Sequence, residues 1–163
     1  MEPPSLVPLA GPDATRRLGS AIAGLARAGD LVVLDGPLGA GKTVLVQGIG
    51  AGLGVRGPVT SPTFVIARVH RAGRLPLVHV DSYRLRDIAE IDDLDLDASV
   101  QESLTVVEWG SGLVEGLADA HLRIELSRPR GGDEPGDADE RHAWLVPVGG
   151  DWAARLRRLE MRA

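Results

Sequence analysis

Cysteine is absent from this 163-residue sequence, which excludes disulfide bonds, zinc ribbons and thiol nucleophiles. No apolar run approaches the roughly 18 residues of a membrane span, and the opening MEPPSLVPLA lacks the basic and apolar regions of a signal peptide. The net charge of -5 argues against nonspecific nucleic-acid binding by the whole surface, although it is compatible with a local basic patch. From these absences we expect a soluble, cytoplasmic protein.

Lysine is almost absent as well, because Lys42 is the one lysine among the 18 lysine and arginine residues. The abundance of glycine, alanine, arginine and aspartate indicates a genome-wide base composition that accounts for this scarcity. It does not explain why the remaining lysine lies in GPLGAGKT, residues 36–43. This segment matches the phosphate-binding pattern G-x-x-x-x-G-K-[ST] in full.

The elements predicted on either side of this segment are those that a phosphate-binding loop requires. A short apolar run, LVVLD (31–35), is typical of a buried parallel strand, and KTVLVQGIGAGLG (42–54) is predicted to be a helix. A chance glycine-rich turn is the alternative in a chain with 21 glycines. The full motif between a strand and a helix favours the phosphate-binding loop.

The chemistry of such a loop explains why this position holds a lysine. Glycines let backbone N–H groups point inward around phosphates, and the helix N-terminus adds a positive potential. Lys42 supplies a compact charge to the outer phosphates, which the planar fork of arginine does not replace, and Thr43 would give its hydroxyl to Mg²⁺. The residues of this segment predicted to bind nucleotide are Gly36, Pro37, Leu38, Gly39, Ala40, Gly41, Lys42, Thr43 and Val44.

The remaining hydrophobic patterns predict an α/β fold. Further helices are expected, in order along the chain, over 13–26, over 83–100 and 111–120 with weaker patterns, and over 151–162. Further strands are expected at 63–70 and 75–81, which form a hairpin, and at 104–108, 121–127 and 141–148. We therefore expect a single domain, residues 1–163, with a P-loop NTPase-like three-layer fold and a mixed central sheet.

Two predicted strands end in an acid, which a magnesium site beside a phosphate-binding loop requires. These runs are LVHVD, ending at Asp81, and LTVVE, ending at Glu108. Spacing alone does not rank the two residues: one is expected to hold the metal or its water, and the other to orient the attacking water. Either could instead be a strand-end acid that faces solvent. The guanine-binding pattern N-K-x-D needs a second lysine, so ATP is the expected nucleotide.

Four motifs in order resemble the TsaE (YjeE) family of small bacterial P-loop ATPases. They are GPLGAGKT (36–43), SPTF (61–64), HVDSYRL (79–85) and VEWG (107–110), and the resemblance covers about residues 30 to 127. The family belongs to the machinery that makes threonylcarbamoyladenosine at position 37 of tRNA. The resemblance implies a P-loop ATPase that uses ATP/ADP and Mg²⁺.

The resemblance also implies roles for individual residues. Thr43 and Glu108 look like the magnesium ligands, and Asp81 looks like the acid near the terminal phosphate, where it both binds nucleotide and serves catalysis. Thr63 lies in a switch-like loop and is a further catalytic candidate, with Glu108 as the third. Trp109 looks like part of a second switch.

Two weaker likenesses and one departure complete the comparison with the family. Nucleotide contacts are implied just before the first long helix, at 11–15, and late in the chain near Arg141. Val44 stands where the family usually has a second threonine, which weakens only an auxiliary phosphate contact.

The function that follows is ATP hydrolysis in the service of tRNA modification, weak alone and stimulated by partners. The resemblance implies a TsaD-like transferase subunit and a TsaB-like companion as partners, and no membrane. The alternatives are a small-molecule kinase and a nucleotide-gated binding module with little hydrolysis. The arginines of the last helix, among them Arg155, suit either a docked helix with a hydrated basic face or a contact with a partner or tRNA.

Overall fold

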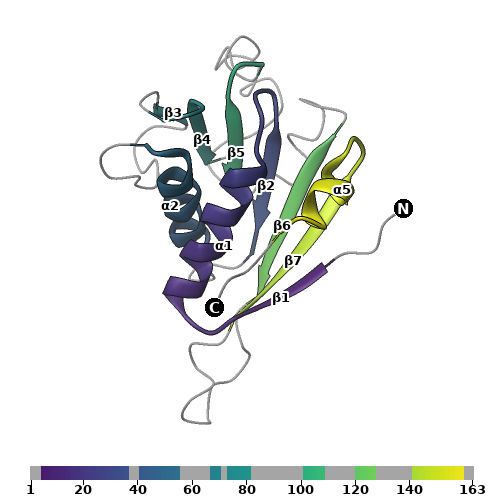
Figure 1. Ribbon diagram of the computed structural model, residues 1–163. Coiled ribbons are helices and arrows are strands. Elements are labelled where there is room, and N and C mark those ends of the chain that lie inside the picture. Colours follow the sequence, from purple (N-terminus) through teal and green to yellow (C-terminus); the bar gives the residue numbers. More distant parts are fainter. Residues whose placement is uncertain are drawn as a thin grey trace.

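The computed structural model describes residues 5–36, 41–55, 67–70, 73–81, 101–108, 120–127 and 141–159. Three helices and seven strands lie in these ranges (Figure 1). The helices are α1 (Pro12–Leu25), α2 (Lys42–Leu53) and α5 (Trp152–Leu156). The strands are β1 (Ser5–Leu9), β2 (Leu31–Asp35), β3 (Ala67–His70), β4 (Leu77–Asp81), β5 (Leu104–Glu108), β6 (His121–Ser127) and β7 (Arg141–Val148).

These strands form one mixed sheet in the order β1-β7-β6-β2-β5-β4-β3. β2 lies between β5 and β6 and is parallel to both, and β4 is parallel to β5. β3 and β7 flank this parallel centre as antiparallel strands, and β1 pairs antiparallel with β7. The four parallel strands therefore end along one edge, here named the carboxyl edge, and begin along the opposite one, the amino edge.

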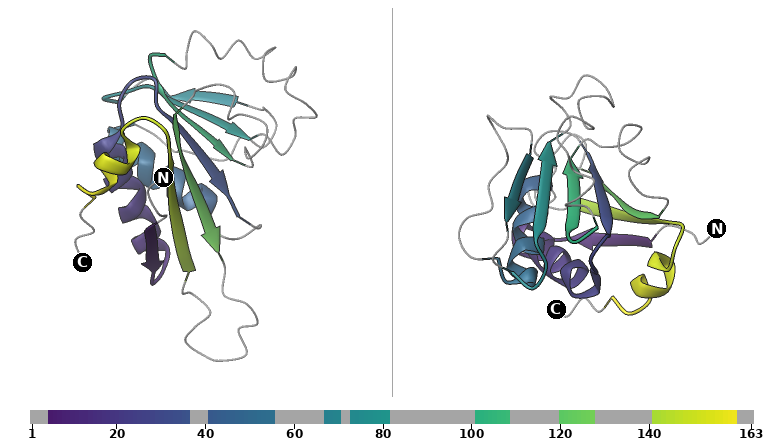
Figure 2. Two further views of the ribbon diagram at one scale, coloured as in Figure 1. Left: turned by 90° about the vertical axis from the view of Figure 1, so that its right-hand side faces the viewer. Right: turned by 90° about the horizontal axis from the view of Figure 1, so that it is seen from above.

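Helices α1, α2 and α5 lie on the same face of the sheet (Figure 2). The core between helices and sheet includes Val32 and Leu34 of β2, Leu18 and Ile22 of α1, and Trp152 of α5, all nearly inaccessible to solvent. The predicted α/β fold with a mixed sheet is confirmed. The segments with weaker helical patterns, 83–100 and 111–120, lie outside the described residues apart from residue 120.

Helices α1 and α2 approach so closely that their backbones touch at glycine positions. A β-carbon on Gly48 would lie 2.3 Å from the carbonyl oxygen of Arg16, and one on Gly19 would lie 2.4 Å from that of Leu45. No larger residue fits there without moving a helix, because the obstructing atoms belong to the backbone. The position of α1 is therefore fixed relative to the helix that follows the glycine loop.

The bounds of α1, α2, β2, β5, β6 and β7 agree with the prediction to within a residue or so, and β3 and β4 form the predicted hairpin. The last helix is shorter than predicted, since α5 ends at Leu156. The hydrated basic face expected there is wrong for Arg155, which is 6% exposed. Its guanidinium pairs with Asp30 and lies over the ring of Trp152, so long-range contacts bury the charge of a residue that follows Trp152 by three positions and shares its face of the helix.

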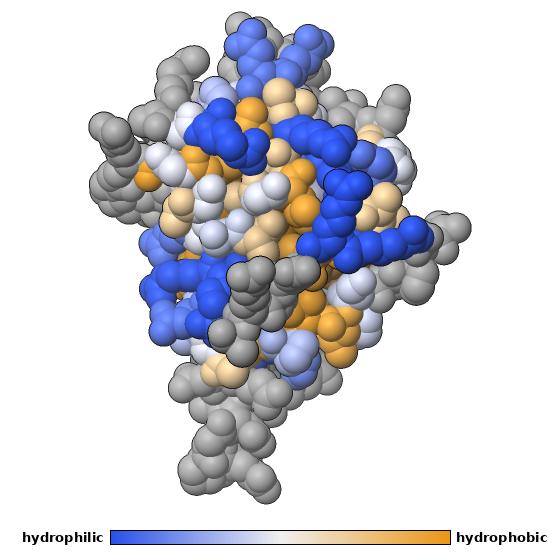
Figure 3. Space-filling model, viewed as in Figure 1, coloured by the Kyte–Doolittle hydropathy of each residue, from blue (hydrophilic) through white to orange (hydrophobic). Residues whose placement is uncertain are grey.

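The surface that carries the helices mixes hydrophilic and apolar residues (Figure 3). Among the residues that the structure describes, no helix has the length and apolar character needed to cross a membrane.

Candidate nucleotide-binding site

Those predicted site residues that the structure describes lie along the carboxyl edge of the sheet. β2 ends there and leads into Gly36, while β4 and β5 end at Asp81 and Glu108, which are direct partners in the strand register. Because β7 is antiparallel to β6, its first residue, Arg141, lies at the same edge. Leu9 pairs with Arg141, so β1 ends and α1 begins here too. Open α/β sheets bind ligands outside the carboxyl ends of their strands.

Lys42 bridges the two described ends of the glycine loop. Its side-chain Nζ donates a hydrogen bond of 2.6 Å to the carbonyl oxygen of Gly36. Only 6% of the lysine is exposed, so its charge is held against Gly36 instead of extending into solvent. Gly41 caps the following helix with φ at 104°, in the left-handed region that favours glycine.

The start of α2 suits an anion. The positive end of the helix dipole lies there, and the first turn contains no acidic residue that could satisfy it from within the helix. Thr43 is the second residue of α2, which brings its hydroxyl close to the end of the loop. A helix N-terminus with a lysine and no acid is typical of a phosphate site.

The start of α1 and the start of β7 meet at the glycine loop. A β-carbon on Gly41 would lie 3.8 Å from Thr15 Cγ2 and 4.0 Å from Arg141 Cδ. Thr15 is 1% exposed, and its hydroxyl faces the carbonyl oxygen of Gly11 at 3.4 Å. The two segments that the resemblance links to nucleotide, 11–15 and the region of Arg141, therefore lie together beside the loop. Their contact with nucleotide stays a prediction.

Glu108 is a buried carboxylate at the end of β5, with 4% of the residue exposed. Its Oε2 lies 2.5 Å from Nε2 of His79, which is fully buried on β4. The register pairs His79 with Val106, so His79 and Glu108 occupy the same face of neighbouring strands. Of Asp81, the structure describes the backbone, and this places it opposite Glu108.

Sequence reasoning missed the partner of Glu108, because it gave no role to His79, the first residue of the motif HVDSYRL. The alternation in HVD puts His79 on the same face as Asp81, which is a usable signal. Recognising the pair also requires knowing that β4 and β5 are neighbours and in which register.

Several predicted site residues lie outside the described part of the chain. These are Pro37, Leu38, Gly39 and Ala40 of the loop, Thr63 of SPTF, and Trp109. Their roles stay predictions.

The donor set fits a magnesium ion that binds together with nucleotide. The described residues hold no group of three histidine, cysteine or acidic side chains that could hold a metal ion by themselves. Magnesium usually binds through one or two carboxylates, with substrate phosphates and water completing its shell. A buried carboxylate, Glu108, on the strand next to β2 and the hydroxyl of Thr43 at the start of α2 are groups of that kind.

The glycine loop between β2 and α2, at the carboxyl edge of a sheet with a parallel centre, defines an α/β protein of the P-loop type. The profile of the family described as "Threonylcarbamoyl adenosine biosynthesis protein TsaE" matches residues 9–134. The chain therefore belongs to the TsaE family.

Individual relatives agree with this assignment. The chain is 55% identical over 142 residues to the protein from Streptomyces coelicolor named tRNA threonylcarbamoyladenosine biosynthesis protein TsaE, covering 85% of this chain and 93% of that protein. A Bacillus subtilis protein of the same name is 38% identical over 139 residues, with 85% and 82% covered. The crystal structure of Bacillus subtilis YdiB superposes with a TM-score of 0.77 at 30% identity, over 98% of this chain and 97% of that one.

Proposed function

We propose that this chain acts in the biosynthesis of threonylcarbamoyladenosine in tRNA, and that its task there is to bind and hydrolyse ATP with Mg²⁺. Membership of the TsaE family supports the pathway. The observation that carries the ATP part is the buried Lys42, whose ammonium reaches back across the glycine loop to Gly36. Lys42 is the first residue of α2, so its positive charge lies beside the positive end of the helix dipole. A phosphate-bearing ligand would interact favourably with both.

In this proposal each group at the carboxyl edge has one task. Lys42 and the backbone of the loop bind the phosphates, while Thr43 and Glu108 hold Mg²⁺, which would offset the charge of the phosphates when bound. Asp81, opposite Glu108 in the register, orients the attacking water. Thr63 acts with it from the switch-like loop.

The rest of the nucleotide is proposed to lie against the segment 11–15 and Arg141. The closeness of Thr15 and Arg141 to Gly41 supports this, because both lie within van der Waals range of a group the size of a methyl at the loop. A cationic side chain beside the loop can also contact a phosphate or stack on the base.

The proposed partners are a TsaD-like transferase subunit and a TsaB-like companion, and this chain does not itself transfer the threonylcarbamoyl group. P-loop hydrolysis can gain about 10³- to 10⁵-fold in rate from an arginine supplied by a partner. We therefore propose weak hydrolysis by the isolated chain and stimulation within the complex. Loss of the terminal phosphate would then reset the complex for another round.

The test compares wild type with Lys42→Ala in a reconstituted tRNA modification assay that can run many rounds. The variant is expected to lose stabilisation by nucleotide, which in wild type is about 2.7 kcal/mol at one hundred times the dissociation constant. It should also support one round of modification at most. Lys42→Arg is the matched control for charge, and it should fail as well because arginine has the wrong shape for this loop.

The same assay separates the two alternatives. Hydrolysis that requires a small acceptor and ignores the partner subunits would favour a kinase. Binding of ATP without hydrolysis, even with the partners present, would favour a nucleotide-gated module. Full-rate cycling without this chain would contradict the proposal.

A further inference from the structure

His79 is a polar residue in a position that the fold would fill with an apolar one. It lies in the middle of β4 and is fully buried. Its partner in the register, Val106, and the preceding residue on its face, Leu77, both belong to the hydrophobic core. A buried polar ring in such surroundings lowers stability unless hydrogen bonds compensate for its lost hydration.

Hydrogen bonds replace the lost hydration of the His79 ring only in part. Its Nε2 meets Glu108 at 2.5 Å. Its Nδ1 is buried and, within the described part of the chain, has no hydrogen-bond partner. A leucine would pack here without that cost, so stability of the fold does not account for this residue. What the histidine adds is its contact with the carboxylate of Glu108.

We propose that His79 is a positioning residue for the metal site, which orients Glu108 as a ligand of Mg²⁺. The inference rests on the proposed function, in which Glu108 is such a ligand. A carboxylate only accepts hydrogen bonds, so the donor is the Nε2–H of the ring. The bond to Oε2 fixes the rotation of the carboxylate at the end of β5. Carboxylates that bind a metal are commonly held in this way, by hydrogen bonds from neighbouring side chains that do not touch the metal.

The position of the pair in the sheet makes this support rigid. The imidazole has only two rotatable bonds and is packed within the core, and the strand that carries it is hydrogen-bonded to the strand that carries Glu108. Because Mg²⁺ accepts little deviation from octahedral geometry, a ligand with a fixed orientation binds it better than one that rotates.

The experiment measures the Mg²⁺ concentration that half-saturates the protein bound to a fluorescent ADP analogue, together with nucleotide affinity in EDTA. His79→Leu is expected to raise the Mg²⁺ midpoint roughly 10- to 100-fold. Nucleotide affinity in EDTA should not change, because the phosphate contacts of the loop remain. His79→Gln places an N–H near the position of Nε2 and is expected to restore most of the metal affinity.

Two further variants keep the test decisive. His79→Asn carries the same amide as His79→Gln on a shorter side chain that does not reach Glu108, so it should bind Mg²⁺ as weakly as His79→Leu. If the leucine variant does not fold, the comparison of His79→Asn with His79→Gln still tests the role of the hydrogen bond. His121→Leu is the control, since His121 is a buried histidine at the start of β6, on the opposite edge of the sheet. It should leave the Mg²⁺ midpoint unchanged.

A double-mutant cycle separates this inference from the proposed function. If His79 acts through Glu108, then adding His79→Leu to Glu108→Gln should weaken Mg²⁺ binding no further. A wild-type Mg²⁺ midpoint in His79→Leu, beside a raised one in Glu108→Ala, would overturn the positioning role alone. A wild-type midpoint in Glu108→Ala would remove Glu108 from the metal site. Both the role of Glu108 as a magnesium ligand and the positioning role of His79 would then be wrong.

Discussion

The two edges of the sheet use buried charged and polar groups in opposite ways. At the amino edge, the guanidinium of Arg155 binds both carboxylate oxygens of Asp30, at 2.6 and 3.0 Å, and lies 3.9 Å over the ring of Trp152. Further donors reach Asp151 and the carbonyl oxygen of Leu25. Four of the five N–H donors of Arg155 are thus used within the chain itself, which makes this cluster a structural joint between α5 and the turn before β2.

At the carboxyl edge, the polar groups instead have the task of binding a ligand in the function that we propose. The ammonium of Lys42 is bonded to Gly36 at the end of β2, and Glu108 ends the neighbouring strand with one oxygen held by His79. The ends of two helices show the same contrast. At the C-terminus of α1, Arg74 donates hydrogen bonds to the carbonyl oxygens of Ala23 and Ala26, at 2.6 and 3.1 Å.

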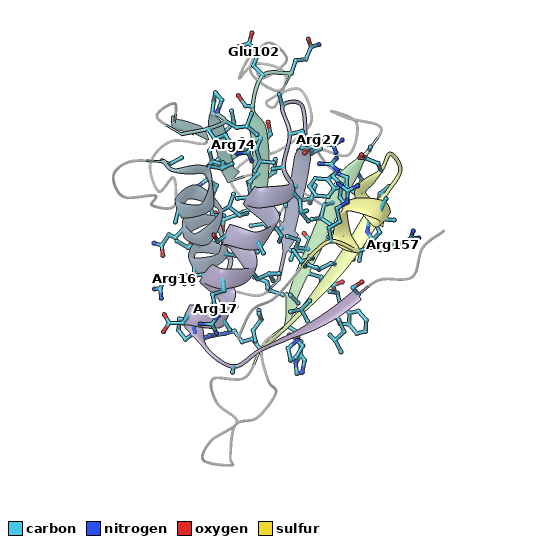
Figure 4. All side chains as sticks on the ribbon, in the orientation of Figure 1. Arg16, Arg17, Arg27, Arg74, Glu102 and Arg157 are labelled. Carbon is cyan, nitrogen blue, oxygen red and sulfur yellow. The ribbon has the colours of Figure 1, made fainter. Side chains whose placement is uncertain are left out.

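Figure 4 shows Arg27 and Arg74 at the C-terminal end of α1, and Arg16 and Arg17 toward its N-terminal end. The N-terminus of α2 has a glycine cap and no acid in its first turn. A helix end that carries its own counter-charge supports the fold, and one that does not can accept a charged ligand.

Breaking the joint at the amino edge should have the largest effect on stability. Arg155→Met removes one partner of a buried pair and leaves Asp30 without its main counter-charge, which costs about 3 to 5 kcal/mol of unfolding free energy. Urea denaturation followed by tryptophan fluorescence measures this loss. At temperatures where the variant is folded, nucleotide should still raise its melting temperature, in contrast to Lys42→Ala.

The neighbouring Arg158 is the matched control, because it is an exposed arginine two residues beyond the end of α5. Arg158→Met should change the unfolding free energy by no more than about 0.5 kcal/mol. An Arg155→Met protein as stable as wild type would show that the joint contributes nothing, and the contrast between the two edges would then lose its basis.

A substitution between α1 and α2 should lower both the stability of the fold and the affinity for nucleotide. A methyl group at Gly48 meets the backbone of Arg16 at 2.3 Å, so Gly48→Ala must push α1 away from α2. We expect a loss of about 1 to 3 kcal/mol of unfolding free energy. Nucleotide affinity should fall as well, because Thr15 at the start of α1 lies beside Gly41. Calorimetric titration with ADP, combined with denaturation, measures the two effects.

Gly24→Ala is the control for this substitution. It introduces the same methyl group on α1, at a position where the new β-carbon meets nothing within 4 Å beyond the adjoining backbone of its own helix. It should stabilise the chain by a few tenths to about 1 kcal/mol, because alanine suits a helix better than glycine. Reduced stability with unchanged nucleotide affinity in Gly48→Ala would mean that α1 does not position the nucleotide.

The difference between the two edges also explains which features the sequence predicted. The glycine loop is a local motif, so its residues could be assigned from spacing alone, and Asp81 and Glu108 follow from the rule that parallel strands share a carboxyl edge. Their pairing was not predictable, because it depends on the order of β4 and β5 in the sheet.

The amino edge was less predictable because its contacts are long-range. Arg155 and Asp30 are separated by 125 residues, and nothing in the local pattern of either segment indicates that they meet. The charge of Arg155 therefore suggested a hydrated face, although its position three residues after Trp152 puts it on the apolar side of the helix. His79 was missed for a related reason, since its role depends on a partner 29 residues away on the neighbouring strand.

The smallest expected effect concerns pH and tests whether the joint at the amino edge is electrostatic. Partial burial raises the pKa of Asp151, but the charge and hydrogen bond of Arg155 and the charge of Arg27 outweigh this and leave the pKa below its usual value of 3.8. The stabilisation from Asp151 is therefore fully present above that value and is lost as the pH falls through the lower pKa of the folded state.

The hydrogen bond to Asp30, with the charges of Asp30 and Asp151, raises the pKa of Arg155 above its usual value. Arg155 therefore keeps its positive charge throughout the acidic range. In this acidic range Asp151→Asn should show a flatter dependence of stability on pH than wild type, because its amide cannot gain a proton there. Asp13→Asn removes one negative charge from an exposed site at the start of α1 and controls for net charge. Denaturation at a series of pH values below 5 makes the comparison. Equal slopes in wild type and Asp151→Asn would mean that Asp151 contributes through packing and not through its charge, and the joint would then depend on the contact between Arg155 and Asp30 alone.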